Sequence, residues 1–250
     1  MLKLSQDDVH VWYAYTDRCR TPELQRGYFE LLNEEERQRH AGFAFDELKL
    51  EYLLTRALCR ITLSRYADVA PQAWQFDRSP LGRPSLASPQ SALGLSFNLS
   101  NTRSLVGIAV ARCNDEVGLD IEEGDRATAW MEIAARFFSR RELAALESLP
   151  ADRRQRRFFD LWTLKESYIK ARGKGLSMPL DAFSIAVEGE IGIVFEPSSA
   201  DEHPQDWQFV LRRLGARHHL AVCLRRPPDR PALVALRETV PGSSDDGGPA

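Results

Sequence analysis

Hydrophobic residues follow two different periods along this chain, and the alternation between them predicts a mixed α+β protein. Apolar side chains at every second position are typical of half-buried strands, whereas apolar side chains three and four positions apart are typical of helices. Strands are predicted at residues 9–15, 94–99, 105–113, 117–123, 182–187, 191–195, 207–214 and 219–224. Helices are predicted at residues 22–32, 34–41 and 127–138, and others are predicted to begin near residues 46, 139 and 152.

Residues at the ends of these segments indicate where some helices begin and end. Ser139 and Glu142 form the sequence signature of a capping box. Asp46 and Asp152 are each expected to cap a long helix, and the second of these helices is expected to stop at Gly173. The segment 79–85 is rich in Pro, Gly and Ser, which predicts a turn.

The predicted elements repeat one order, a strand or strands with helices followed by further strands. This order predicts two α+β halves, an N-terminal half at residues 1–115 and a C-terminal half at residues 116–226. From residue 227 onward Pro, Gly, Ser and Asp dominate, so residues 227–250 are predicted to form a tail that is disordered at its end.

Composition narrows the class of protein. With 250 residues, of which 43% are hydrophobic, the chain can bury a substantial core. The formal net charge of −3 gives no general attraction to a polyanion, so we expect no nucleic-acid partner. No apolar stretch is long enough to cross a bilayer and the first residues lack the features of a signal peptide, so we expect no membrane association and a cytoplasmic location.

Cysteines and known catalytic motifs give little support to several other classes. Cys19, Cys59, Cys113 and Cys223 are scattered without metal-ligand spacing, so they are expected to be reduced packing residues and zinc is not expected. The chain has no nucleophile elbow, no P-loop and no dinucleotide fingerprint. Hydrolase, P-loop and Rossmann interpretations therefore lose their usual support.

Two segments carry the candidate chemistry. In the predicted strand 117–123, Asp120 and Glu122 lie two apart and should point to the same face. In the predicted helix after residue 152, Glu166 and Lys170 lie four apart and should share one side. Magnesium prefers a few carboxylates and leaves its other positions to water and substrate phosphate. The two segments together therefore indicate a magnesium site that handles phosphate.

Each segment also has a simpler explanation. Asp120 and Glu122 could form the solvated side of an edge strand, and Glu166 with Lys170 could be an ordinary surface ion pair of a helix. However, both segments are rich in large apolar residues, among which charged groups are rarely found unless they are paired or bound to a metal. This setting favours the functional interpretation.

Several motifs, in order, closely resemble the surfactin-type phosphopantetheinyl transferases. The resemblance covers roughly residues 9–225. It rests on the motifs Leu81-Gly-Arg-Pro84, Phe97-Asn-Leu-Ser100, Gly118-Leu-Asp-Ile-Glu122, Phe137-Phe-Ser-x-x-Glu142, Leu161-Trp-Thr-x-Lys-Glu-Ser-Tyr-x-Lys170 and Gly173-Lys-Gly-Leu-Ser-x-Pro-Leu180. The family's fold implies a pseudo-twofold monomer of two similar α+β halves, with the active site in the cleft between them. The family's reaction implies transfer of the phosphopantetheine arm of coenzyme A to a serine of an acyl or peptidyl carrier protein, with release of adenosine 3′,5′-bisphosphate.

The resemblance also implies roles for individual residues. Asp120, Glu122 and Glu166 would hold Mg²⁺, Lys170 would neutralise phosphate oxygens, and Glu166 would also accept the serine proton. Lys165 is a further catalytic candidate. Coenzyme A would be bound by Lys170 together with Arg83, Ser100, Asn101 and Arg39. Asn101 stands where relatives usually have histidine, so it can donate a hydrogen bond but carries no charge.

The carrier-protein surface is expected in the second half of the chain. The resemblance places Trp130, Met131 and Ile133 in a carrier groove, although core packing would also explain these three residues. Arg153 and Arg154 belong to a basic cluster that an acidic carrier protein would complement, although a solvated basic face would explain it equally well. Two other classes stay open: a non-catalytic module that binds coenzyme A or a carrier protein, and a magnesium-dependent nuclease, which the acidic balance of charge disfavours.

Overall fold

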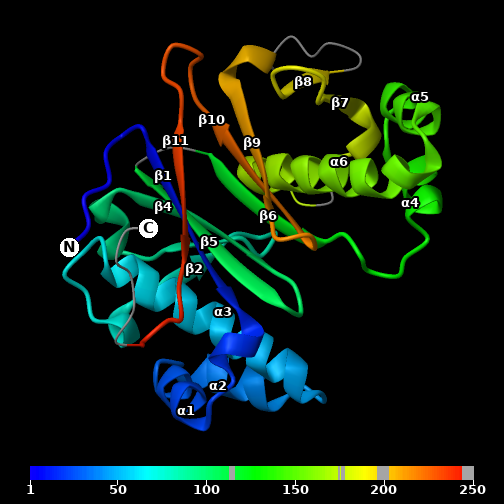
Figure 1. The fold of residues 1–250 in the computed structure, drawn as a ribbon. Coiled ribbons are helices and arrows are strands. Elements are labelled where there is room, and N and C mark those ends of the chain that lie inside the picture. Colours follow the sequence, from blue (N-terminus) through cyan, green and yellow to red (C-terminus); the bar gives the residue numbers. More distant parts are fainter. Residues whose placement is uncertain (113–115, 174, 176–177, 196–202, 244–250) are drawn as a thin grey trace. The chain divides into compact units, whose positions relative to one another are not determined.

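Two β-sheets, each with a long helix packed against it, organise the chain (Figure 1). The structure is a computed structural model, and it describes residues 1–112, 116–173, 175, 178–195 and 203–243. The chain divides into two compact units. The first unit combines residues 1–114 with residues 233–250, and the second unit consists of residues 115–232. The protein is therefore of the mixed α+β class, as its sequence predicts.

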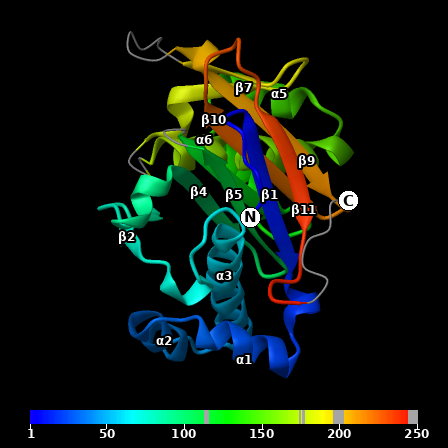
Figure 2. The same ribbon diagram turned by 90° about the vertical axis from the view of Figure 1, so that its left-hand side faces the viewer.

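The first unit contains a four-stranded sheet in the order β11-β1-β5-β4. The helix α3 packs against this sheet, chiefly against β5, and its apolar residues join those of β1 and β5 in one core (Figure 2). The strands of the unit are β1 (Asp8–Tyr15), β2 (Phe76–Arg78), β3 (Pro84–Leu86), β4 (Leu95–Asn101), β5 (Leu105–Arg112) and β11 (Leu233–Glu238). Its helices are α1 (Pro22–Glu30), α2 (Glu34–Ala41) and α3 (Asp46–Ser64).

The second unit contains a three-stranded antiparallel sheet in the order β6-β10-β9. The long helix α6 packs on it along β6 and β10 (Figure 1). The strands of the unit are β6 (Val117–Glu123), β7 (Phe183–Ala186), β8 (Gly192–Phe195), β9 (Trp207–Leu214) and β10 (His218–Arg225). Its helices are α4 (Trp130–Phe137), α5 (Arg140–Ser148) and α6 (Ala151–Arg172). Short 3-10 helices in the two units span Thr16–Cys19, Pro71–Ala73, Gln90–Leu93, Leu180–Ala182 and Pro204–Asp206.

Gly118 brings β6 unusually close to α6. A Cβ atom at this position would lie 1.9 Å from the carbonyl oxygen of Ser167 and 2.5 Å from the backbone nitrogen of Ala171. Both neighbours are backbone atoms of α6, so no side chain could rotate away to make room. Glycine at residue 118 therefore lets a strand that carries acids pack directly on a helix that carries an acid and a lysine.

The end of α6 follows the sequence prediction. Gly173 follows the helix in the left-handed conformation, with a φ of 64°, and its backbone N–H donates to the carbonyl of Lys170. Glycine adopts this conformation at little cost, which explains why the helix stops there. The capping box of α5 is also confirmed, because the Ser139 and Glu142 side chains each accept from the other's backbone N–H.

Two predictions about the elements were wrong, and one about a turn is confirmed. The predicted tail 227–250 contains β11, which pairs in parallel with β1 and completes the sheet of the first unit. The predicted turn 79–85 is confirmed, because residues 79–83 connect β2 to β3 in a small hairpin and only Pro84 and Ser85 belong to β3. Asp46 and Asp152 do not cap their helices, because α3 begins at Asp46 itself after Phe45 and α6 begins at Ala151 after Pro150. The end of the predicted tail, residues 244–250, lies outside the described residues.

Three of the four cysteines are free and buried, which confirms their predicted packing role. Burial raises the pKa of Cys59 to about 12 and also raises the pKa of Cys223, so both thiols are kept in the inert neutral form. Cys113 lies outside the described residues. Among the described helices, none combines the length and the apolar character that crossing a membrane requires.

Candidate active site

Asp120 and Lys170 form the centre of the candidate site in the second unit. The ammonium of Lys170, in the last turn of α6, donates to Oδ1 of Asp120 in β6 over 2.8 Å. Asp120 is almost fully buried, whereas 29% of the Lys170 side chain is exposed. Glu166 precedes Lys170 by one helical turn and is partly buried. The close packing at Gly118 thus brings the acids of β6 to the face of α6 that carries Glu166 and Lys170.

Glu122 is held by two neighbours that the sequence analysis did not assign to the site. The indole N–H of Trp162 donates to Oε1 of Glu122 over 3.1 Å. The guanidinium of Arg126 lies 3.5 Å from Oε2 of the same carboxylate. Trp162 precedes Glu166 by four residues and so lies on the same side of α6, a spacing that could have revealed its role. From the sequence, Trp162 was identified only as part of a motif in an apolar setting.

The charges of these acids act on one another. Burial, and after it the negative charge of Asp120, raises the pKa of Glu122 from its ordinary 4.5 to about 7. The same two causes, in the same order, raise the pKa of Glu166, and the cation of Lys170 opposes the rise. Asp120 therefore lies close enough to both glutamates for its charge to be felt by each. The three predicted metal ligands share one electrostatic environment.

The donor chemistry at this place fits a hard divalent cation. Three carboxylates supply only oxygen ligands, which magnesium prefers, and a cation among them would offset the burial and the repulsion that together raise the two glutamate pKa values. Within the described residues, however, no group of three or more His, Cys, Asp or Glu side chains has the arrangement of a metal site. The cation that contacts Asp120 is the ammonium of Lys170. Magnesium binding therefore stays a prediction.

Lys165 does not share this environment. Its side chain is fully buried, and its ammonium donates to Oε1 and Oε2 of Glu142 and to the carbonyl of Phe183 over 2.9, 2.7 and 2.6 Å. An ammonium has three hydrogens, and these three acceptors match them. The catalytic role expected for Lys165 does not fit this geometry, because the ammonium is enclosed and already committed to other groups.

The residues predicted to bind coenzyme A, apart from Lys170, all lie in the first unit. Ser100 is buried in β4, and Asn101, the next residue, is exposed at the end of that strand and donates its side-chain amide to Glu51 of α3. Arg39 lies at the end of α2 with its guanidinium 5.7 Å from the ring centre of Tyr52. Arg83 is partly buried beside β3, and its backbone N–H donates to the Ser79 hydroxyl. Their role toward the nucleotide stays a prediction.

The residues predicted to contact a carrier protein have mixed surroundings. Trp130, Met131 and Ile133 of α4 are partly buried and pack against the core of the second unit. The guanidinium of Arg154 donates to the carbonyls of Leu149 and Glu147, so it satisfies carbonyls at the end of α5. Arg153 is exposed. Of the two arginines, Arg153 keeps its side chain available for a partner, while Arg154 already has a structural role.

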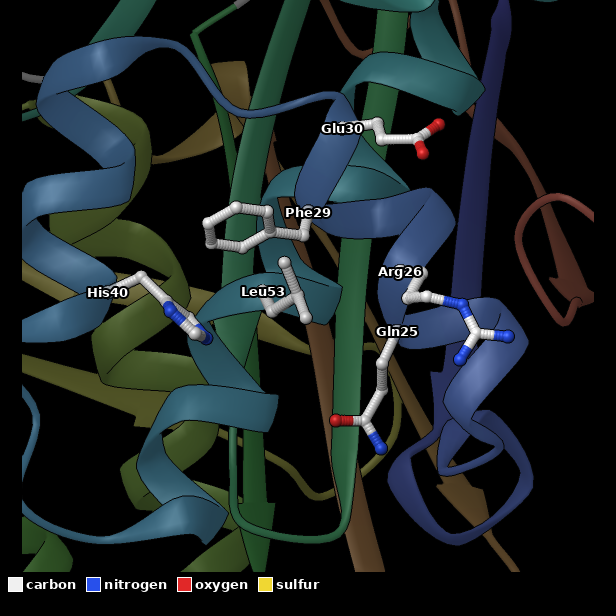
Figure 3. A pocket seen from close by; sticks show the side chains of 6 residues that line it. All are labelled: Gln25, Arg26, Phe29, Glu30, His40 and Leu53. Atoms are coloured by element: carbon white, nitrogen blue, oxygen red, sulfur yellow. The ribbon is translucent and has the colours of Figure 1, made fainter.

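Two cavities are lined by residues other than those of the acidic cluster. In the first unit, a cavity of about 320 Å³ lies beside Phe29, His40 and Leu53 from α1, α2 and α3, and Figure 3 shows these side chains around it. In the second unit, a cavity of about 450 Å³ lies at the start of α6, next to Gln155 and His219. None of the predicted site residues lines either cavity.

Buried carboxylates that crowd one another beside a lysine are compatible with an enzyme of the class that transfers phosphate-bearing groups. Comparison with known proteins identifies the family. The family model described as the 4′-phosphopantetheinyl transferase superfamily matches residues 116–223, and the model of the 4′-phosphopantetheinyl transferase N-terminal region matches residues 21–113. The chain belongs to the 4′-phosphopantetheinyl transferase superfamily.

Individual relatives agree with this assignment. The chain is 34% identical to the 4′-phosphopantetheinyl transferase HetI of Nostoc sp. over 74% of its own length and 77% of that protein. It is 28% identical to the 4′-phosphopantetheinyl transferase Sfp of Bacillus subtilis over 92% of its own length and 99% of that protein. It is also 34% identical to a putative 4′-phosphopantetheinyl transferase of Synechocystis sp. over 67% of its own length and 65% of that protein. These matches confirm the resemblance on which the sequence analysis relied.

Proposed function

We propose that this enzyme transfers the 4′-phosphopantetheine arm of coenzyme A to a serine hydroxyl of an acyl or peptidyl carrier protein. The serine oxygen attacks the β-phosphorus of the coenzyme A pyrophosphate. The bond from that phosphorus to the bridging oxygen breaks, and adenosine 3′,5′-bisphosphate leaves. Such a reaction needs a group that accepts the serine proton and positive charge that offsets the phosphate oxygens.

Glu166 is the residue proposed to accept the proton. Its raised pKa brings the carboxylate closer to the operating pH, which favours a group that must take up a proton during the reaction. Lys170 is proposed to neutralise phosphate oxygens, because its partly exposed ammonium lies on the same side of α6 one turn away. Trp162 is proposed to keep the Glu122 carboxylate in place through its indole N–H.

Asp120, Glu122 and Glu166 would hold the magnesium ion that the family uses. When bound, this ion supplies positive charge to the pyrophosphate and orients it. The observation that supports the assignment most directly is electrostatic. Burial, and after it the charge of Asp120, raises the pKa of both Glu122 and Glu166, while the ammonium of Lys170 lies 2.8 Å from Oδ1 of Asp120.

The proposal is tested by mass spectrometry of purified carrier proteins after incubation with the enzyme, coenzyme A and magnesium. The native enzyme is expected to add one phosphopantetheine to the carrier serine. Asp120→Asn and Glu166→Gln are expected to abolish the addition while the protein stays folded. Asp181→Asn is a matched control, because Asp181 is an exposed carboxylate in the same unit. Retained labelling by both site variants would refute the proposed roles.

The same samples distinguish the other two functions. Tight binding of coenzyme A in a calorimeter without any labelled carrier would favour a non-catalytic module. Magnesium-dependent nicking of plasmid DNA that is lost in Asp120→Asn would favour a nuclease. Comparison of acyl and peptidyl carrier proteins in parallel reactions would identify the natural class of acceptor.

Other expectations from the resemblance are carried forward as part of the proposal. These are the pseudo-twofold relation of the two halves, an active-site cleft between them, the monomeric state and the cytoplasmic location. Ultracentrifugation would test the monomeric state, and a crystal structure with coenzyme A bound would test the cleft.

A further inference from the structure

The buried ammonium of Lys165 is the hub of a polar network inside the second unit. Besides its three hydrogen bonds to Glu142 and Phe183, it lies 4.1 Å from the ring centre of Phe183. Lys165 is 0% exposed and Glu142 is 3% exposed, so water solvates neither charged group. A buried charge is costly unless it is paired and hydrogen-bonded, and this pair meets both conditions.

Glu142 connects the pair to two other elements. Its Oε1 accepts from the backbone N–H of Ile185 in β7 over 2.8 Å, and its Oε2 accepts from the backbone N–H of Ser139 over 3.0 Å. The Ser139 hydroxyl also lies 2.7 Å from the Ser184 hydroxyl. One carboxylate therefore joins the start of α5, the middle of α6 and the strand β7.

A second buried contact holds α6 from another side. Asp160 pairs with His219 over 2.8 Å and with Arg213 over 2.5 Å, and these partners belong to β10 and β9. Successive residues of a helix are rotated by about 100°, so Asp160 and Lys165 point in directions about 140° apart. Two anchors at different angles fix the rotation of a helix about its axis, which one anchor alone would not do.

We propose that Lys165 is a positioning residue of the transferase, whose pair with Glu142 fixes the rotation of α6. Glu166 is the next residue, so any rotation that Lys165 allows moves Glu166 and Lys170 relative to Asp120 by the same angle. This inference rests on the roles proposed above for Glu166 and Lys170. Lys165, the motif lysine next to Glu166, therefore supports the site and takes no part in its chemistry.

The test uses two variants of the full chain. Lys165→Met removes the ammonium and leaves the Glu142 carboxylate buried without its cation. Glu142→Gln combined with Lys165→Met removes both charges and keeps a residue that can complete a capping box. Lys49→Met is a matched control, because Lys49 is a lysine of α3 that forms an ion pair with the exposed Asp46. Thermal unfolding, kcat, KM for coenzyme A and the pH profile of labelling are measured for each.

Lys165→Met is expected to unfold at a lower temperature and to lose about 100-fold in kcat, because an active-site displacement near 1 Å has about that effect. The double variant is expected to recover most of the unfolding temperature and to return within about 10-fold of the native kcat. Its pH profile should keep the native alkaline limb, since the ammonium of Lys165 takes no part in the reaction. The control should behave as the native enzyme.

Three results would overturn the inference. The first is a double variant that is as stable as the native enzyme but as inactive as Lys165→Met, because the amine itself would then be needed for chemistry. The second is a double variant that does not recover folding, and the third is a fully active Lys165→Met. Glu166→Gln in the same assay separates the two proposals. If Glu166→Gln labels carriers normally, the proposed function of that residue fails regardless of Lys165.

Discussion

Replacing Gly118 by alanine is the sharpest test of how the acidic cluster is assembled. The new Cβ would lie 1.9 Å from the Ser167 carbonyl oxygen, whereas ordinary contacts begin at 3.4 Å, so β6 and α6 must separate locally by about 1.5 Å. The obstacle is helix backbone, and it cannot move without disturbing α6. Overpacking in a core costs about 1–3 kcal/mol, and a clash with rigid backbone belongs at the upper end.

The expected loss is therefore about 3 kcal/mol of unfolding free energy, which corresponds to a fall of roughly 6–12 °C in Tm for a chain of this length. Activity should fall by more than the smaller fraction of folded protein explains. Asp120 follows Gly118 by two residues and Glu166 directly precedes Ser167, so the separation moves the acids apart. A displacement of this size is expected to lower kcat/KM by about 100-fold in the protein that remains folded.

The assay combines thermal unfolding with carrier labelling below the unfolding transition. Gly192→Ala provides the matched control, because Gly192 is a strand glycine of the same unit with no atom within 4 Å of its added Cβ. The control should keep native activity and a Tm close to the native value. A Gly118→Ala protein with native Tm and native activity would refute the argument that this close approach builds the site.

Four further outcomes are expected. Burial and Asp120 raise the pKa of Glu122 from 4.5 to about 7, so metal-free native protein loses stability as the pH rises through that interval. Glu122→Gln should therefore match the native protein near pH 4 and exceed it by up to about 3 kcal/mol at pH 8 in urea unfolding with EDTA; a pH-independent difference would contradict this. Trp162→Phe removes a hydrogen bond that favours the charged Glu122, so the acidic limb of the activity profile should move up by about one pH unit, and an unmoved limb would count against the contact. Lys170→Met should lower kcat about 10²–10³-fold at saturating coenzyme A, and a change in KM alone would point to a binding role only. A chain stopped after Ala232 lacks β11 and should show a lower Tm and a tendency to aggregate; native behaviour by calorimetry and size-exclusion chromatography would show that β11 is dispensable.

Sequence periodicity predicted most of the helices and strands because their signals are local. The alternation in Val117–Glu123 correctly placed Asp120 and Glu122 on a strand, and the four-residue spacing correctly placed Glu166 beside Lys170. β11 was missed because it lies among Pro, Gly and Ser residues and pairs with β1, more than two hundred residues earlier in the chain. No local sequence pattern indicates that a strand will pair with another strand so far away in the chain.

Lys165 shows a different limit of sequence reasoning. It stands next to Glu166 in a motif, and neighbours in sequence suggest a shared role. On a helix, however, adjacent residues point about 100° apart, so the two side chains meet different surroundings. The partner of Lys165 is Glu142, which lies 23 residues earlier and was interpreted only as part of a capping box. The second role of that glutamate depends on tertiary packing.

The place of β11 in the chain has a consequence for biosynthesis. The entire second unit lies between β5 and β11, so the growing polypeptide carries an open β1 edge until the ribosome has passed residue 238. Domains usually fold in the order in which they are synthesised. Here the first unit cannot complete its sheet until the second unit has been synthesised. An open edge invites pairing with other chains, so we expect nascent molecules to depend on chaperones during that interval.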